Sequence, residues 1–241
     1  MSERKPESAG PERVAGRRAS VVSKSAEPAA PRRRPGRPSG TARGPLQREK
    51  LLDVALGLFA RQGIVETTLG EIAREAGVTS AMMHYYFHTR EQLIDVLIDE
   101  RFIPLRETIR GAFEHLDDPV AAITDLVERL VKVSEDHPWF APLWIREVVS
   151  EGGILRQRMN DRYGDADQNA ALARIVRWQR EGLLNAHLEP SLIIESAVGL
   201  TMLPLATSGL WNTTAARRSL SAREIGRHVI ALLTHGISSS R

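Results

Sequence analysis

A tight succession of helix boundaries around Gly77 constrains the fold of this chain more than any other feature of its sequence. Thr68-Leu69-Gly70-Glu71 matches a capping box, in which the threonine and glutamate side chains satisfy backbone N–H groups at a helix start. Gly77 can take left-handed dihedrals and so end that helix, and Thr79 can cap the next one. The pattern predicts two short helices, over residues 68–76 and 79–87, joined by a tight turn.

Helical signals continue on both sides of this pair. Upstream, an amphipathic helix from Leu46 to near Gly63 is predicted because apolar residues recur at helical spacing at Leu51, Ala55, Leu58 and Phe59. Downstream, Thr89-Arg90-Glu91-Gln92 repeats the capping-box pattern and opens a fourth helix, which Pro104 is expected to kink or end. A longer helix followed by two short helices around a glycine turn is the helix-turn-helix layout.

The second short helix has two faces of different character. Met83 and Phe87 lie four residues apart and are expected to close the core of the three-helix unit. The opposite face presents side chains that can contact base edges, thymine methyl groups and phosphates. These are Ser80, Ala81, Met82, His84, Tyr85 and His88. Tyr86 fits either the surface or a position under the fourth helix.

The rest of the chain also reads as helix. Starts are marked at Asp118-Pro119, His137-Pro138, Glu189-Pro190 and the capping box Ser221-Ala222-Arg223-Glu224. No segment shows the sustained period-two alternation of a half-buried strand. We therefore predict an all-α fold, with further helices over 119–136, 139–150, 153–182 with a break near Gly164, 190–209 and 221–237.

Charge is distributed unevenly. Residues 1–45 hold seven of the thirteen prolines and eleven Lys and Arg residues against four Glu, with almost no bulky apolar residue. We predict a disordered basic arm over 1–45, a helix-turn-helix domain over 46–100, and a helical effector-binding and dimerisation domain over 101–241. Residues 46–100 hold five basic residues against nine acidic ones, so attraction to DNA must come from elsewhere.

The arm offers that attraction. PRRRPGRPSG, residues 31–40, resembles the minor-groove AT-hook around its Gly-Arg-Pro core, although its residue order differs from the usual hook. Our hypothesis is that its arginines contact the minor groove or phosphates beside each half-site. These are Arg33, Arg34, Arg37 and Arg43. The alternative is a solvated tail that binds any polyanion.

The sequence argues against several other classes of protein. Without cysteine, neither disulfides, a thiolate zinc site nor a cysteine nucleophile is available, and a reducing cytoplasm is the natural compartment. The first residues lack the apolar stretch of a secretory signal, and no run of about 18 apolar residues predicts a membrane span. The common hydrolase, zinc-protease, Walker and Rossmann motifs are absent, so we expect no enzyme, metal or other cofactor.

The segment TTLGEIAREAGVTSAMMHYYFHTREQLIDVLIDE, residues 67–100, resembles the DNA-binding domain of the tetracycline-repressor (TetR) family. The likeness extends upstream through LLDVALGLFARQGIVETT and covers 47–100. It implies that Thr68 and Thr79 lie near phosphates at helix N-termini. It also implies that a groove-facing set is formed by Ser80, Met82, His84 and Tyr85. It places Thr89 and Arg90 at the phosphate backbone. Ala81, Met82 and His84 depart from the residues common in the family, so the operator sequence does not follow.

The resemblance implies a dimer with half-sites about one helical turn (~34–36 Å) apart, formed by the last two helices. Residues 190–209 and 221–237 match those helices, although they could instead be buried within one subunit. Residues 104–185 would enclose the pocket for an apolar or flat effector. The predicted lining is His137, Trp139, Phe140, Trp144, Met159, Tyr163 and Trp178, with Arg146 and Glu147 as further polar groups. Taken singly, each aromatic residue and Met159 fits the core better than a ligand contact.

These inferences predict a ligand-responsive transcriptional regulator. It would bind a palindromic double-stranded operator as a homodimer, act as a repressor, and be released by a small-molecule effector. The alternative is a DNA-binding protein without small-molecule control, which is regulated by a protein partner or acts architecturally.

Overall fold

A computed structural model describes residues 43–113, 116–150, 152–163, 166–211 and 220–237. These residues form helices and turns and contain no strand, as predicted. The predicted arm contacts of Arg33, Arg34 and Arg37 lie outside the described residues, as does the side chain of Arg43. The first helix begins at Arg43, three positions before the expected Leu46.

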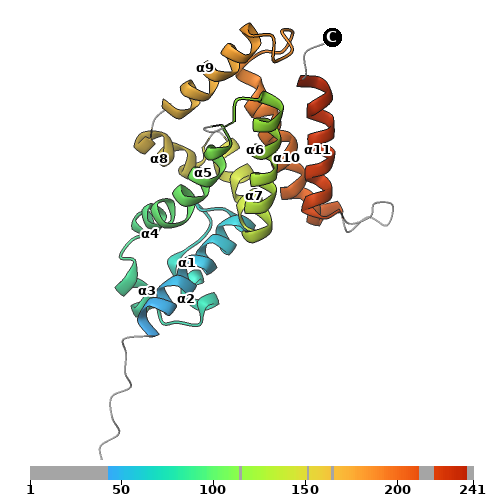
Figure 1. Ribbon diagram of the computed structural model, residues 1–241. Coiled ribbons are helices and arrows are strands. Elements are labelled where there is room, and N and C mark those ends of the chain that lie inside the picture. Colours follow the sequence, from blue (N-terminus) through green and yellow to red (C-terminus); the bar gives the residue numbers. More distant parts are fainter. Residues whose placement is uncertain (1–42, 114–115, 151, 164–165, 212–219, 238–241) are drawn as a thin grey trace, which may run out of the picture. The chain divides into compact units, whose positions relative to one another are not determined.

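The N-terminal helices form the predicted helix-turn-helix unit, which we call the reading head. Helix α1 (Arg43–Gln62) is followed by the short helices α2 (Leu69–Ala76) and α3 (Ser80–Tyr86) (Figure 1). Helix α1 packs against α2, and α2 packs against α3. The apolar residues predicted for α1 are buried, including Leu51, Ala55 and Phe59.

A single helical path leads out of the reading head. It consists of α4 (Arg90–Leu97), the π-helical segment η1 (Ile98–Phe102), α5 (Ile103–Arg110) and the 3₁₀ turn η2 (Gly111–Phe113). Pro104 has no backbone N–H, and its ring would clash with the carbonyl of residue 100 in a regular α-helix. The wider π-helical turn before Pro104 avoids this clash, so the helix continues instead of ending.

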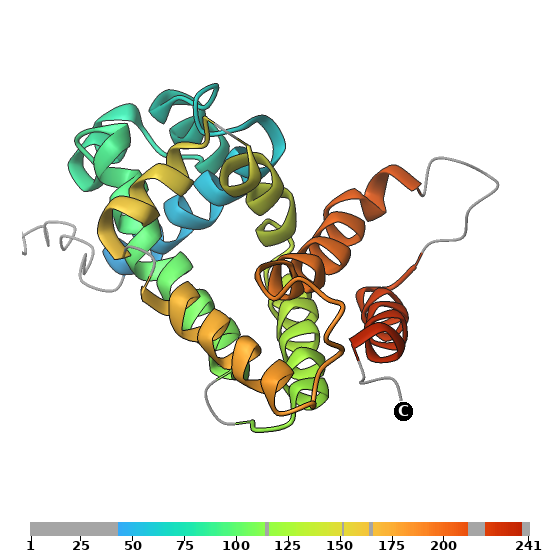
Figure 2. The same cartoon turned by 90° about the horizontal axis from the view of Figure 1, so that it is seen from above.

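The C-terminal helices make up what we call the body. They are α6 (Pro119–Asp136), α7 (Phe140–Trp144), the π-helical segment η3 (Ile145–Val149), α8 (Ile154–Tyr163), α9 (Ala166–Arg180), α10 (Ser191–Trp211) and α11 (Ala222–Ile237). The helix predicted over 139–150 is an α-helix only to Trp144 and continues as the π-helical segment η3. The break predicted near Gly164 separates α8 from α9. In Figure 2, α6 lies between α9 and α11.

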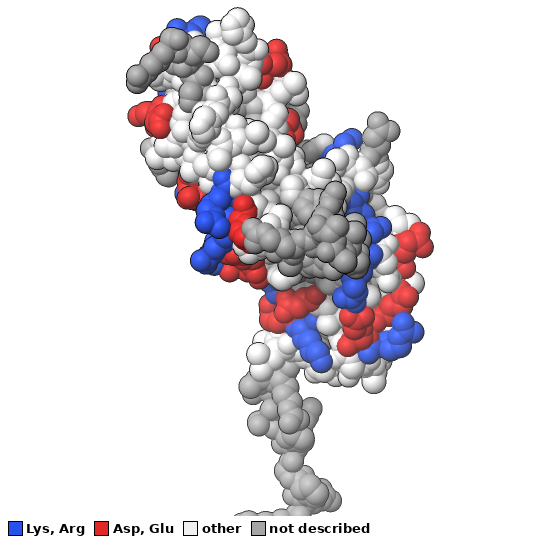
Figure 3. All heavy atoms as spheres, turned by 90° about the vertical axis from the view of Figure 1, so that its right-hand side faces the viewer, with Lys and Arg blue, Asp and Glu red and all other residues white. Residues whose placement is uncertain are grey.

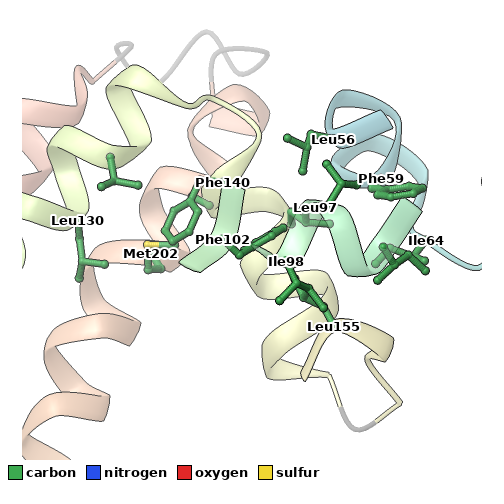
Figure 4. Close-up of a cluster of buried hydrophobic side chains, with 14 of the residues drawn as sticks. Leu56, Phe59, Ile64, Leu97, Ile98, Phe102, Leu130, Phe140, Leu155 and Met202 are labelled. Atoms are coloured by element: carbon green, nitrogen blue, oxygen red, sulfur yellow. The ribbon is translucent and has the colours of Figure 1, made fainter. Parts of the chain in front are cut away.

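One apolar cluster runs from the reading head into the body. Phe59 of α1, Ile98 and Phe102 of η1, Phe140 of α7 and Met202 of α10 all belong to it, and each is almost fully buried (Figure 4). Because protein interiors are close-packed, a displacement of Phe102 is transmitted to both neighbours of η1. The helical path is thus tied to the head on one side and to the body on the other.

Candidate DNA-binding interface and effector cavity

The turn between α2 and α3 has the geometry that the sequence predicts. Thr68 and Glu71 form the complete capping box, and the hydrogen bond from the Thr68 backbone N–H lowers the pKa of the Glu71 carboxyl. Gly77 adopts φ 71°, in the left-handed region, and the N–H of Val78 donates to the carbonyl of Ala73 at 2.9 Å. This closure fixes the angle at which α3 leaves α2.

The orientation of α3 agrees with its predicted inner face. Thr79 caps the helix by accepting a hydrogen bond from the N–H of Met82 at 3.2 Å. Met83 and Phe87 are 0% and 1% exposed, so their predicted role in the core is confirmed. Arg48 of α1 lies over the Phe87 ring and pairs with Glu100 through two hydrogen bonds, which ties the end of α3 to α1 and η1.

The opposite face of α3 is accessible. Ser80, Ala81, His84 and His88 are exposed, and Met82 is half-buried. Tyr85 is 74% exposed and its ring packs edge-on against Tyr86 at 5.2 Å between centroids. The Tyr86 hydroxyl donates to the carbonyl of Gly44 at 3.0 Å, so Tyr86 has a structural role that sets the position of Tyr85.

The start of α4 differs in detail from the predicted capping box. Thr89 accepts from the N–H of Gln92 as expected, but the Gln92 side chain accepts from the N–H of His88 rather than from that of Thr89. The Arg90 guanidinium donates to the carbonyl of Val65 at 2.9 Å, which holds the loop between α1 and α2. Contact of Thr68, Thr79, Thr89 and Arg90 with phosphates stays a prediction.

The body contains a cavity of about 270 Å³ between α5, α6, α7, α8, α9 and α10. Phe140, Trp144 and Met159, three of the predicted lining residues, line it. The remaining lining comes from the residues that follow: Phe102, Arg106, Ile109, Arg110, Phe113, Leu126, Val148, Arg156, Asn160, Gln168, Ala171, Ile194 and Val198.

The other predicted pocket residues lie elsewhere. His137 and Trp139 are outside the lining, and Trp139 packs edge-on against Phe102 at 5.3 Å between centroids. Trp178 is fully buried beneath Arg174, so it is a core residue. The side chain of Tyr163 lies outside the described residues.

Arg146 and Glu147, predicted as polar groups of the pocket, instead join the body to the head. The Glu147 carboxylate is 5% exposed and accepts from the N–H of Ile64 at 3.0 Å. Arg146 donates to the carbonyl of Arg61 at 3.3 Å. The Arg146 bond meets the last turn of α1, and the Glu147 bond meets the chain just after that helix, next to Gly63 with φ 94°.

Sequence reasoning missed the lining that comes from the helical path. Phe102, Arg106, Ile109, Arg110 and Phe113 recur at i, i+4, i+7, i+8 and i+11, the spacing of one helix face. This periodicity was a usable signal. It crosses Pro104, however, and the expectation that proline ends or kinks the helix concealed it.

Helices α10 and α11 carry apolar residues that the subunit leaves exposed. They are Leu192, Leu200 and Leu203 on α10 and Leu232 on α11, between 39% and 57% exposed. Figure 3 shows a mostly uncharged upper area on the side where α11 lies, and mixed charges on the lower part. By length and composition α10 is also able to cross a bilayer, which sequence inspection did not anticipate. Its buried residues Ile193, Ala197 and Met202 belong to the core.

An exposed recognition helix on a helix-turn-helix head, joined to an all-helical body with a largely apolar cavity, defines a DNA-binding regulator. Residues 51–97 match the family model "Bacterial regulatory proteins, tetR family", and residues 100–201 match "YcdC-like protein, C-terminal region". The chain is 30% identical over 156 residues to the transcriptional regulator RutR of Escherichia coli K12, with 61% of this chain and 68% of RutR aligned. The chain therefore belongs to the TetR family of transcriptional regulators.

Two further similarities agree with this membership. BetI of Rhizobium meliloti is 36% identical over 98 residues, which span 41% of this chain and 46% of BetI, somewhat under half of that relative. The solved structure of the ketosteroid regulator KstR2 of Mycobacterium tuberculosis has a TM-score of 0.62 at 19% identity, covering 80% of this chain and 96% of that one. At such low identity the structure supports the fold alone.

Proposed function

We propose that the protein is a homodimeric, ligand-responsive repressor that acts in the cytoplasm. In each subunit α3 would enter the major groove of one half-site and present His84, Tyr85, Ser80 and Met82 to the bases. One observation carries this proposal: Met83 and Phe87, at the inner face of this short helix, are buried, whereas Tyr85 on its outer face is exposed. Such a helix is held rigidly from behind while its outer face stays free to read DNA.

The dimer interface is proposed on α10 and α11. Four exposed leucines lie on these two adjacent helices. Exposed apolar residues grouped in this way are typical of a protein–protein interface. Gly199 of α10 and Gly236 of α11 face open space, so a partner helix could approach the backbone closely there. A two-fold contact of this surface would place two reading heads on one operator.

Helix α8 is positioned to couple the cavity to the head. Met159 and Asn160 of α8 line the cavity. Arg158 and Arg162 of the same helix pair with Asp95 and Asp99, which lie on α4 and η1. A ligand that moves α8 would therefore pull on the helical path that leaves the head.

We propose a two-state mechanism through this connection. The ligand binds more tightly to an arrangement in which the two heads no longer match successive grooves. Operator affinity then falls by at most the ratio of the ligand's affinities for the released and the DNA-bound arrangements. Phe102 belongs both to the cavity wall and to the apolar cluster that reaches the head, so it provides a second route.

The arm is proposed to add the attraction that the acidic head lacks. Removal of residues 1–40 leaves α1 intact, because that helix begins at Arg43. We expect this truncation to weaken binding to every DNA sequence and to reduce the salt dependence by about 0.9 in log–log slope for each phosphate that the arm neutralises. An unchanged slope would show that the arm does not contact the DNA backbone.

The proposal is tested by release of the protein from its operator. Fragments selected from genomic DNA would supply the operator, and a low-molecular-weight extract of the cells would be titrated against the labelled complex. We expect concentration-dependent release. The alternative, a regulator without small-molecule control, predicts that the complex survives this extract and is released by a protein fraction.

Substitution of the α8 arginines separates coupling from binding. Arg158→Ala with Arg162→Ala should keep operator binding but blunt release, and Arg180→Ala, on the exposed surface of α9, should change neither. Reversing one pair, with Arg158→Glu and Asp95→Lys together, should restore part of the response that Arg158→Glu loses. Full release from the double alanine variant would contradict this route.

A further inference from the structure

The effector cavity has a charged side that the expectation of an apolar or flat ligand did not include. Arg106 and Arg110 on α5 and Arg156 on α8 all line it, and no aspartate or glutamate is among the lining residues that the structure describes. Glu107 lies on α5 between the first two and pairs with both, at 3.4 Å from Arg106 and 2.8 Å from Arg110. The guanidinium groups of Arg106 and Arg110 therefore lie on this side of the cavity with Glu107 as a shared neighbour.

Arg156 is distinct from the other two. Among the described residues no carboxylate lies within ion-pair distance of it, and its side chain is exposed. It projects from α8, the helix whose neighbouring residues Arg158 and Arg162 are engaged with α4 and η1. An anion that bridges Arg156 and the α5 arginines would therefore draw α8 toward α5, which continues the helical path that Arg158 and Arg162 already contact.

Apart from the amide side chains of Asn160 and Gln168, the rest of the described cavity wall is apolar. Its large side chains include Phe102, Phe113, Leu126, Phe140, Trp144 and Val198. Transfer of a ligand's hydrocarbon or ring from water onto this wall is favourable, whereas its charged end is stabilised only where the arginines can hydrogen-bond to it.

From this division we infer that the effector is a small amphipathic carboxylate. Its apolar body lies against the aromatic wall, and its carboxylate is held by Arg156 together with Arg106 or Arg110. Arginine presents a planar fork of donors that matches a carboxylate in two parallel hydrogen bonds. The cavity of about 270 Å³ lies at the lower end of ligand-site volumes, which favours a short acyl chain or a single ring.

This inference rests on the proposed ligand-responsive function but is tested without DNA. Binding of hexanoate, octanoate and 3-phenylpropanoate to the full-length protein would be measured by calorimetry, each beside the alcohol and the amine of the same carbon skeleton. We expect at least one carboxylate to bind about tenfold or more tightly than both of its counterparts, because only the anion forms charge-assisted hydrogen bonds. If no carboxylate exceeds its alcohol, including the case in which none binds, the inference is wrong.

Two matched variants assign the selectivity to the cavity. Arg156→Gln removes a charge without an ion-pair partner among the described residues, so it should leave folding intact. It should reduce the carboxylate preference about tenfold with little change for the alcohol. Arg180→Gln removes an exposed arginine of α9 that does not line this cavity and should leave the preference intact. Equal effects of the two variants would show a nonspecific charge effect and overturn the assignment.

Failure of this inference is distinguishable from failure of the proposed function. If a neutral or cationic molecule releases the protein from its operator, the proposed function holds and the carboxylate inference is wrong. If octanoate binds selectively through Arg156 but the protein stays on its operator, the carboxylate site is confirmed and the proposed control by a ligand is wrong.

Discussion

At the scale of single residues, α3 divides its side chains between stability and recognition. Met83→Ala should lower the free energy of unfolding by about 2–5 kcal/mol, because Met83 is fully buried and its truncation leaves a cavity. Tyr85→Ala, on the exposed face, should change it by only about 0.5 kcal/mol yet weaken operator binding. Urea denaturation and DNA titration of the two variants check this. Equal loss of stability in both would contradict the orientation of α3.

Glu100 gives the reading head a dependence on acid. Its hydrogen bonds from Arg48 hold the pKa of the Glu100 carboxyl below its ordinary value of 4.5. A lowered folded-state pKa means that the stabilisation is fully present above pH 4.5 and is lost as the pH falls through the folded value. The urea midpoint of Glu100→Gln should therefore lie below that of wild type at neutral pH and converge with it in acid. Glu128→Gln, which removes a carboxylate without an ion-pair partner among the described residues, should show no such convergence.

At the scale of elements, the turn between α2 and α3 depends on the left-handed conformation of Gly77. A Cβ added there would meet no atom within 4 Å, so the cost of Gly77→Ala is that of the backbone conformation alone. We expect a loss of about 1–2 kcal/mol by urea denaturation. Gly77→Asn should lose less, because asparagine tolerates this region. A neutral Gly77→Ala would mean that the turn can rearrange.

Features of α2 and α3 that depend on neighbouring residues were predictable from the sequence, whereas contacts between distant helices were not. The caps at Thr68 and Thr79 and the inner face of α3 were predictable because each depends on residues a few positions apart. The cavity was predictable only in part. Trp178 and Trp139 pack into the core, and Arg106, Arg110 and Arg156 come together from α5 and α8 through tertiary folding. Periodicity along one helix does not reveal which other helix faces it.

The head–body contact of Glu147 was beyond sequence reasoning for the same reason. Its partner, the N–H of Ile64, is 83 positions away in the chain. A glutamate on a helix is most often solvated, and nothing in its neighbours marks it as buried. The packing of α7 beside α1 brings Glu147 to this position, because η3 directly follows α7.

At the scale of the assembled protein, the exposed leucines of α10 and α11 predict a dimer. We expect charged side chains introduced at these positions to dissociate it. Leu203→Asp with Leu232→Asp should give a folded monomer, because both side chains are exposed in the subunit and would be buried only between subunits. Sedimentation analysis measures the mass, and circular dichroism checks that the helices persist. A dimer that survives both substitutions would place the interface elsewhere.

The central claim is that two heads present the outer face of α3 to successive major grooves. Hydroxyl-radical footprinting on a selected operator tests it most directly. We expect two protected patches related by a two-fold axis and about one helical turn (~34–36 Å) apart. Both should disappear together in Tyr85→Ala, while Arg180→Ala keeps them. A single patch, or protection that persists unchanged without Tyr85, would contradict the claim.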